Sequence, residues 1–129
     1  TYLDWAEANF ELNDIQGGSH QLVKADVTEW LGNCRQKFDL VFCDPPTFSN
    51  SASAEDFDVQ KDHVALLENI MSVLSDDGVC YFSNNFRKFK LDVEALSVFA
   101  DVEDISARTI EVDFERSPKI HRCWKLTKS

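Results

Sequence analysis

Residues 37–48, which read KFDLVFCDPPTF, decide the fold class of this chain of 129 residues. The continuous apolar run Phe38–Cys43 predicts a strand covered on both faces, as in a parallel sheet. Pro45 and Pro46 cannot donate to a strand ladder, so they end this strand and stiffen the segment that follows. Because ligands of open α/β sheets bind beyond the carboxyl ends of the strands, residues 44–48 are expected to line a site. The alternative is that Asp-Pro-Pro is only a turn.

The composition is that of a globular domain with an acidic surface. Apolar residues make up 43% and aromatic residues 12% of the chain, which excludes a disordered protein. No apolar run approaches the roughly 18 residues of a membrane helix, so no membrane partner is expected. The four cysteines are scattered, without the Cys/His spacing of a zinc site. We therefore expect reduced thiols, no metal and a cytoplasmic location.

The net charge of −10 argues against nonspecific attraction to nucleic acid over the whole surface. It leaves room for a local basic face, for which residues 87–90 (RKFK) are the clearest candidate. The alternative for these residues is an ordinary solvated surface.

Hydrophobic periodicity and capping residues predict alternating helices and strands. Helices are expected at Thr1–Asn13, Thr28–Cys34 and Val59–Leu74, and from the cap Asp92 to Phe99; strands are expected at His20–Val27, Phe38–Cys43, Val79–Ser83, Val102–Thr109 and Arg122–Thr127. Residues 49–56 are predicted to form a mobile loop, with Gly78 as a left-handed residue after the third helix. The pattern indicates an α/β fold of parallel crossovers that ends in two successive strands.

An Asp-Pro-Pro-aromatic motif after an apolar strand resembles the fourth motif of class I (Rossmann-like) S-adenosylmethionine-dependent methyltransferases. Four further stretches narrow the resemblance: YLDWA at 2–6, DVQKDH at 58–63, FSNN at 82–85 and IHRCW at 120–124. With them, essentially the whole chain resembles the RlmK-type domain, the C-terminal methyltransferase domain of bifunctional bacterial 23S rRNA guanine methyltransferases. The resemblance implies methylation of guanine N7 in 23S rRNA with S-adenosyl-L-methionine as cofactor. It also implies a mostly parallel sheet with a terminal antiparallel strand pair.

The chain departs from this family at its front. The family places a Gly-rich turn and an acidic second strand earlier, whereas this chain has 4 glycines and no G-x-G. We therefore expect residues 1–129 to be a partial catalytic domain without the first two strands of the fold. Such a fragment is expected to bind the cofactor weakly or not at all and to be inactive alone.

This departure has a consequence for the sheet, whose order in the family is 3-2-1-4-5-7-6. The strand Phe38–Cys43 would lose its inner neighbour and present an apolar edge, which seeks a partner. Either His20–Val27 pairs with it in parallel, giving the order 3-4-5-7-6, or two copies of the chain form a homodimer through this edge.

The resemblance assigns substrate roles to residues at the strand ends. Guanine N7 already carries a lone pair, so Asp44 is interpreted as a positioner of base or cofactor, with Pro45 and Pro46 holding the backbone. Thr47 and Phe48 are expected to contact the base, and Phe48 could stack on a flipped base; the alternative for Phe48 is core packing.

The same resemblance assigns further binding residues. Asn84 and Asn85 are expected to line the base pocket, and Arg87 and Lys88 to bind RNA phosphate. Asp26 and Val27 fall where the superfamily contacts the adenine of the cofactor, with Tyr2 nearby. The alternative for Asp26 is that it only caps the next helix.

Three other readings stay open. Cys43 could be a nucleophile for pyrimidine methylation, but it is expected to point away from Asp44 and to be a buried structural thiol. The substrate could be an exocyclic base amine, for which Asp-Pro-Pro-aromatic is also used. The chain could also be a noncatalytic RNA-binding or dimerisation module.

Overall fold

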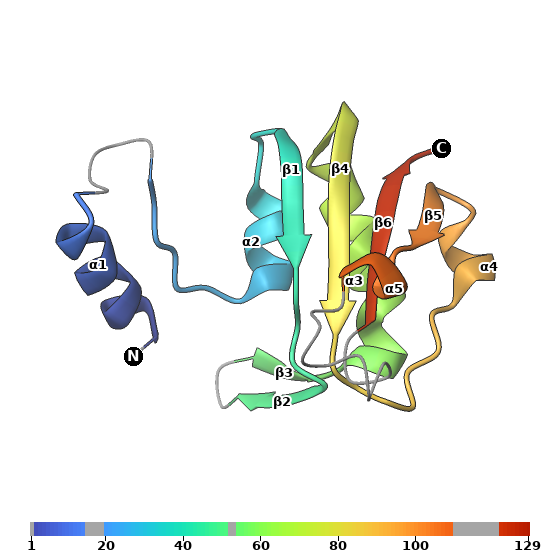
Figure 1. Ribbon diagram of the computed structural model, residues 1–129, viewed down its shortest axis with the longest axis horizontal. Coiled ribbons are helices and arrows are strands. Elements are labelled where there is room, and N and C mark those ends of the chain that lie inside the picture. Colours follow the sequence, from blue (N-terminus) through green and yellow to red (C-terminus); the bar gives the residue numbers. More distant parts are fainter. Residues whose placement is uncertain (1, 15–19, 52–53, 110–121) are drawn as a thin grey trace.

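The computed structural model describes residues 2–14, 20–51, 54–109 and 122–129. Its helices are α1 (Tyr2–Leu12), α2 (Val27–Asn33), α3 (Val59–Ser72), α4 (Val93–Leu96) and α5 (Ser106–Thr109). Its strands are β1 (Phe38–Cys43), β2 (Phe48–Ser51), β3 (Ala54–Asp58), β4 (Leu74–Asn84), β5 (Ala100–Asp104) and β6 (Arg122–Lys128). Figure 1 shows a sheet with α2 and α3 behind it and a small β2–β3 hairpin below it.

The main sheet has four strands in the order β1-β4-β6-β5. β1 and β4 are parallel, whereas β6 runs antiparallel to both β4 and β5. This order matches the 4-5-7-6 part of the predicted sheet and includes the predicted antiparallel finish. Among the described strands one neighbouring pair is parallel and two are antiparallel, because the predicted strand at His20–Val27 does not form.

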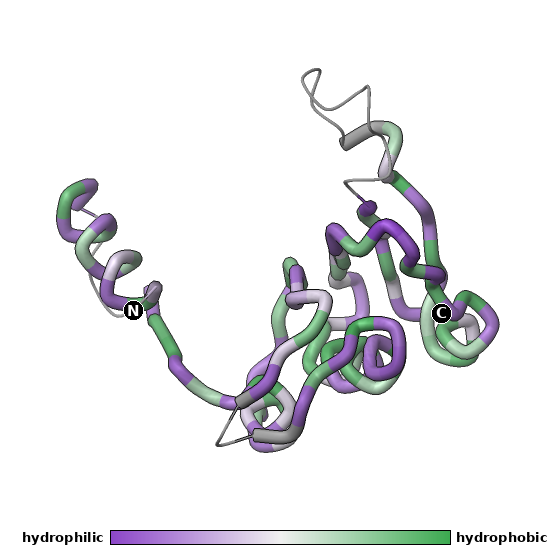
Figure 2. Tube along the Cα trace, turned by 90° about the horizontal axis from the view of Figure 1, so that it is seen from below, coloured by the Kyte–Doolittle hydropathy of each residue, from purple (hydrophilic) through white to green (hydrophobic). Residues whose placement is uncertain are grey.

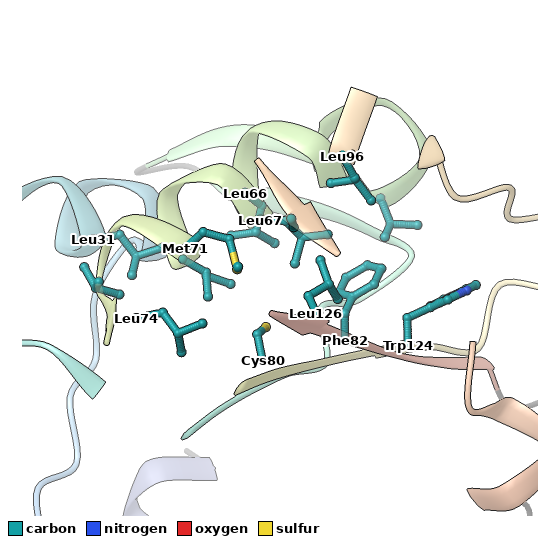
Figure 3. Packing of buried hydrophobic residues seen from close by; sticks show 14 of the residues in the cluster. Leu31, Leu66, Leu67, Met71, Leu74, Cys80, Phe82, Leu96, Trp124 and Leu126 are labelled. Carbon is teal, nitrogen blue, oxygen red and sulfur yellow. The ribbon is translucent and has the colours of Figure 1, made fainter. Parts of the chain in front are cut away.

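The core lies between α3 and the face of the sheet formed by β4 and β6. Alternate residues of a strand point to one face, and Cys80, Phe82, Trp124 and Leu126 are all buried on the α3 side. Residues at helical spacing on α3 meet them, and Figure 3 shows how these side chains gather with Leu31 of α2 and Leu96 of α4. The predicted apolar stripe of the third helix is confirmed.

The prediction of a strand at His20–Val27 is wrong. Residues 20–26 have no strand conformation, and all residues from 20 to 30 are exposed. A strand needs a neighbour for its backbone groups and a covered face for its apolar side chains. The described part of the chain offers neither to Leu22 and Val23, so the local apolar pattern is not sufficient here.

Residues 49–51 and 54–56, the described part of the segment predicted as a loop, belong to the antiparallel strands β2 and β3. Phe48 pairs with Asp58 and Ser49 with Phe57, so the segment returns directly to the start of α3. Its Ser- and Asn-rich sequence looked like a loop, but the ladder is made by backbone groups and does not need apolar side chains. Phe57, which is partly buried against the core, fixes the hairpin to the body of the domain.

Several element ends also differ from the prediction, and the strand predicted at Val79–Ser83 already begins at Leu74. The strand predicted at Val102–Thr109 stops at Asp104, whose side-chain oxygen accepts a hydrogen bond from the backbone N–H of Ser106 (2.9 Å) and starts α5. The third helix ends at Ser72 and the fourth at Leu96, earlier than expected. Gly78 is not in the left-handed conformation. It allows a close approach of the chain to Leu74, since a Cβ at position 78 would lie 2.7 Å from Cγ of Leu74. Residues 110–121, between the last two predicted strands, lie outside the described residues.

The outer edge of β1 and the helix α1 are poorly covered. Leu40 and Phe42 of β1 are 64% and 67% exposed, and no described strand pairs with β1 on that side. Helix α1 has no buried residue and stands apart from the sheet (Figures 1 and 2). Figure 2 shows apolar residues along α1, of which Tyr2, Trp5 and Leu12 are exposed. None of the described helices is long and apolar enough to cross a membrane.

Candidate functional site

The predicted site lies where β1 and β4 end side by side. Because these strands are parallel and Cys43 pairs with Phe82, the residues after them meet at one edge of the sheet. The hydroxyl of Ser83, which is buried, donates to Oδ1 of the exposed Asp44 over 2.9 Å. The second carboxylate oxygen of Asp44 has no partner among the described residues, so it is available to a ligand.

We call residues 44–48 the lip. Behind it, the carbonyl of Thr47 accepts a hydrogen bond from the backbone N–H of Val59 over 3.0 Å. Asp58 caps the same helix, since its Oδ1 accepts from the N–H groups of Gln60 (2.9 Å) and Lys61 (3.3 Å). The lip is thereby attached to the first turn of α3. At its far end Phe48 is 55% exposed, so it does not pack in the core as the alternative required.

Asn84 and Asn85 follow β4 but differ in accessibility. Asn84 is only 1% exposed, and its Oδ1 accepts from the backbone N–H of Phe86 over 3.0 Å. This bond fixes the orientation of the amide, and its Nδ2 is left without a hydrogen-bond partner among the described residues. Asn85 is exposed beside it. Of the two predicted base-pocket residues, Asn85 is thus open to a ligand and Asn84 mainly shapes the turn.

The basic residues sit on a well-built turn, which we call the basic turn and define as residues 86–89. The N–H of Phe89 donates to the carbonyl of Phe86 over 3.0 Å, which closes the turn. Phe89 is buried against Phe82 and Trp124, while Arg87 and Lys88 at the tip are exposed. No carboxylate in the described parts of the chain forms an ion pair with either cation. Arg87 and Lys88 are therefore two exposed cations without an ion-pair partner in the described structure, on a protein whose net charge is −10.

The residues predicted to bind the cofactor are not brought together. Asp26 caps α2, because its Oδ1 accepts from the N–H groups of Thr28 (2.9 Å) and Glu29 (3.4 Å). Its neighbour Val27 is exposed. Tyr2 lies on α1, is 84% exposed and contacts Trp5 edge to face at 5.6 Å. Figure 1 shows α1 set apart from α2 and the lip, so Tyr2 and Asp26 do not form one pocket.

The structure supports a structural role for Cys43. Burial, followed by the nearby Cys80 and Asp44, raises the pKa of the Cys43 thiol to about 12. The thiol packs against the core cluster and stays protonated at neutral pH, whereas a nucleophile has to be a thiolate. The four cysteines all fall in described segments and are free thiols.

Sequence reasoning missed Ser83 as a partner of Asp44. The two residues are 39 positions apart, and their contact depends on the register of β1 against β4. The available signal was the FSNN stretch that carried part of the resemblance, in which Ser83 is the second residue.

The described residues also form an apolar hollow of about 280 Å³ along β1. It is lined by Trp30, Leu40 and Phe42 among others, and by no residue of the lip. No group of three His, Cys, Asp or Glu side chains in the described segments is arranged to hold a metal ion.

Comparison with known proteins places this geometry in context. No family model matches the sequence. The chain is 54% identical over 127 residues to the ribosomal RNA large subunit methyltransferase K/L of Cellvibrio japonicus (strain Ueda107). The match covers 98% of this chain but 17% of that protein, so the chain spans about a sixth of its relative's length. The predicted resemblance to an RlmK-type methyltransferase is confirmed.

Solved structures give the same fold. SMU.776, a proposed methyltransferase crystallised with SAH, matches 95% of this chain with a TM-score of 0.67 at 24% identity, over 35% of its own chain. The SAM-dependent methyltransferase from Agrobacterium tumefaciens matches 98% of this chain with a TM-score of 0.67 at 11% identity, over 45% of its own chain. These matches confirm the class I methyltransferase fold.

Proposed function

Since the chain is a relative of the K/L ribosomal RNA methyltransferases, we propose that it belongs to an enzyme that methylates guanine N7 in 23S rRNA. The observation that carries the proposal is the 54% identity over nearly the whole chain. The link between Asp44 and Ser83 at the end of two parallel strands supports the location of the site. We propose that residues 1–129 form part of the catalytic domain.

Asp44 is assigned as the residue that positions the reacting groups. N7 carries its own lone pair, so transfer requires alignment of base and methyl group and no prior removal of a proton. The Ser83 hydroxyl holds one carboxylate oxygen of Asp44, which leaves the other to accept a hydrogen bond from the base or the cofactor. Pro45 and Pro46 limit the backbone freedom of the lip.

The base is assigned to the outer part of the lip. An enzyme that modifies a base takes it out of its stack and holds it against aromatic or apolar surfaces. Phe48 offers such a surface, and the exposed Thr47 and Asn85 offer hydrogen-bonding groups. Asn84 contributes by fixing the start of the turn that carries Asn85.

S-adenosylmethionine supplies the electrophilic methyl group in this proposal. Asp26 keeps one carboxylate oxygen free of the helix cap, and the apolar Val27 is exposed next to it, so this pair fits an adenine ring and its amine. Tyr2 would reach the same ring only if α1 moved from its present place.

The RNA backbone is assigned to Arg87 and Lys88, which form no ion pair within the described structure and lie on the turn after β4, the strand that pairs with β1. We further propose a cytoplasmic location, where the substrate RNA and reduced thiols are found, and a homodimer through the outer edge of β1.

The experiment compares Asp44→Ala with Asp39→Ala in the full-length protein. The two residues form a matched pair at opposite ends of β1, because the Ser75 hydroxyl donates to Asp39 Oδ1 (2.7 Å) as the Ser83 hydroxyl does to Asp44. We expect Asp44→Ala to lower the rate of methyl transfer about 100-fold. Its free energy of unfolding should change by less than about 1 kcal/mol, and Asp39→Ala should retain activity.

Nucleoside mass spectrometry of the treated 23S rRNA identifies the product. Detection of 7-methylguanosine supports the proposal. Detection of a base methylated on its exocyclic amine would instead show that the enzyme methylates exocyclic amines. RNA binding without any methylated product would indicate a noncatalytic module. Equal losses of activity and stability in Asp44→Ala would make Asp44 a structural residue.

A further inference from the structure

The first turn of α3 touches both sides of the candidate site. Its residues 58–63 (DVQKDH) belong to the stretches that carry the family resemblance, yet the proposed reaction gives them no role. In the structure this turn is hydrogen-bonded to the lip through Val59 and Thr47, and to the segment after the basic turn through Gln60 and His63.

The side chain of Gln60 forms two hydrogen bonds with the backbone of Lys90. Its Nε2 donates to the carbonyl of Lys90 over 2.8 Å, and its Oε1 accepts from the N–H of Lys90 over 2.9 Å. The side-chain amide thereby pairs with the backbone as a neighbouring strand would. Two bonds in this geometry fix both the distance and the orientation of the chain directly after the basic turn.

His63 strengthens the same attachment from the core. Its Nδ1 faces the carbonyls of Val59 (2.9 Å) and Gln60 (3.0 Å), which only accept, so Nδ1 carries the proton. Nε2 is then the acceptor for the N–H of Asp92 over 3.2 Å. The buried ring also packs edge to face on Phe89 at 4.8 Å, so both the end of the basic turn and the residues after it are held.

We propose that Gln60 is a positioning residue for RNA binding, which holds the cations of the basic turn at a fixed separation from the lip. The inference rests on the proposed function, in which the lip takes the base and Arg87 and Lys88 take phosphate. A turn that is already ordered loses less conformational entropy when it binds, so its cations bind the backbone more tightly. A fixed separation also presents the base to the lip at the same time.

The test is a double-mutant cycle with protein-free 23S rRNA as the probe. Gln60→Met keeps the length of the side chain and removes both hydrogen bonds to Lys90. We expect it to weaken RNA binding by the full-length protein about threefold to tenfold, the range for one or two lost hydrogen bonds. Arg87→Ala with Lys88→Ala should weaken binding more and should lower the slope of log affinity against log salt by up to about 1.8.

The decisive measurement is the combined variant. If Gln60 acts by placing these cations, adding Gln60→Met to Arg87→Ala/Lys88→Ala causes no further loss of affinity. Gln36→Met, an exposed glutamine between α2 and β1, should leave affinity unchanged in both backgrounds. Urea unfolding of each variant reports the stability separately.

Two outcomes would overturn the inference in different ways. An equal loss in both backgrounds, or no loss in either, would mean that Gln60 does not act through the basic turn, while the proposed RNA surface would stand. An unchanged affinity and salt slope in Arg87→Ala/Lys88→Ala would remove the RNA surface itself, and the role of Gln60 with it.

Discussion

β4 and β1 are neighbours in one sheet with similar apolar sequences, yet their surroundings differ. β4 lies between two strands and under α3, and its Cys80 and Phe82 are fully buried. Among the described strands β1 has one neighbour, and its Leu40 and Phe42 remain largely exposed. An apolar pattern therefore predicts that the side chains of a strand need to be buried. The helices and strands that bury them are distant in sequence, so the pattern alone does not predict burial.

The largest expected effect is a difference in the free energy of unfolding between a substitution at the centre of the sheet and one at its edge. Phe82→Ala should lower the free energy of unfolding of the 129-residue chain by about 3–5 kcal/mol, since the ring packs on Phe89 and Trp124 within the core. Phe42→Ala should change it by less than about 0.5 kcal/mol at protein concentrations low enough for the chain to be a monomer. Urea unfolding measures both variants. Similar losses would mean that β1 is covered in solution, and the contrast would disappear.

A second prediction uses the pH dependence of the buried thiol on β4. Burial, and then the proximity of Cys123, raises the pKa of Cys80 from 9.0 to about 12. The folded state therefore holds this proton more tightly than the unfolded state. Stability is retained below about pH 9 and falls as the pH rises from there toward 12.

At pH 10 this one thiol should cost about 1.4 kcal/mol of stability relative to neutral pH. Cys80→Ala, measured by urea unfolding at pH 7 and pH 10, should lose less stability between the two pH values than the parent chain. Its lower stability at pH 7 does not affect the comparison, because only the difference between the pH values counts. An equal pH dependence in both proteins would show that the Cys80 site is open to water.

The features that were predictable from sequence are local. The strand Phe38–Cys43, its proline end and the caps Asp26 and Asp92 depend on residues within a few positions, and all of them form. The order of the last four strands followed from the family resemblance and is observed as well.

The features that failed depend on partners distant in sequence. Leu22 and Val23 have the pattern of a strand, but no described strand lies beside them. The contact of Ser83 with Asp44 requires the register of two strands, which composition does not contain. The end of β5 was a missed local signal, because Asp104 two residues before Ser106 is a helix-starting pattern.

The edge of β1 gives a third prediction, which tests the proposed homodimer. Unpaired strand edges with exposed apolar side chains associate readily. The 129-residue chain should self-associate with rising concentration in sedimentation equilibrium. Phe42→Lys should weaken this association about tenfold or more, because it removes an apolar side chain and adds like charges. Val98→Lys, an exposed apolar position beyond α4, is the control. A monomer at every concentration would rule out the dimer.

The smallest effect is expected in α1, the region least connected to the core. Tyr2 and Trp5 contact each other edge to face, but α1 has no buried residue. A helix of 11 residues is also short for independent stability in water, so its loss should not affect the rest. Tyr2→Ala with Trp5→Ala should therefore change the free energy of unfolding by less than about 0.5 kcal/mol.

Trp124→Ala is the matched comparison for α1, because this buried indole packs on both Phe82 and Phe89 and its loss should cost about 3–5 kcal/mol. If the α1 variant also lost more than about 2 kcal/mol in urea unfolding, the aromatic face of α1 would have to be buried in solution. That result would require α1 to pack on the uncovered side of β1. It would also move Tyr2 toward the sheet, which its proposed contact with adenine requires.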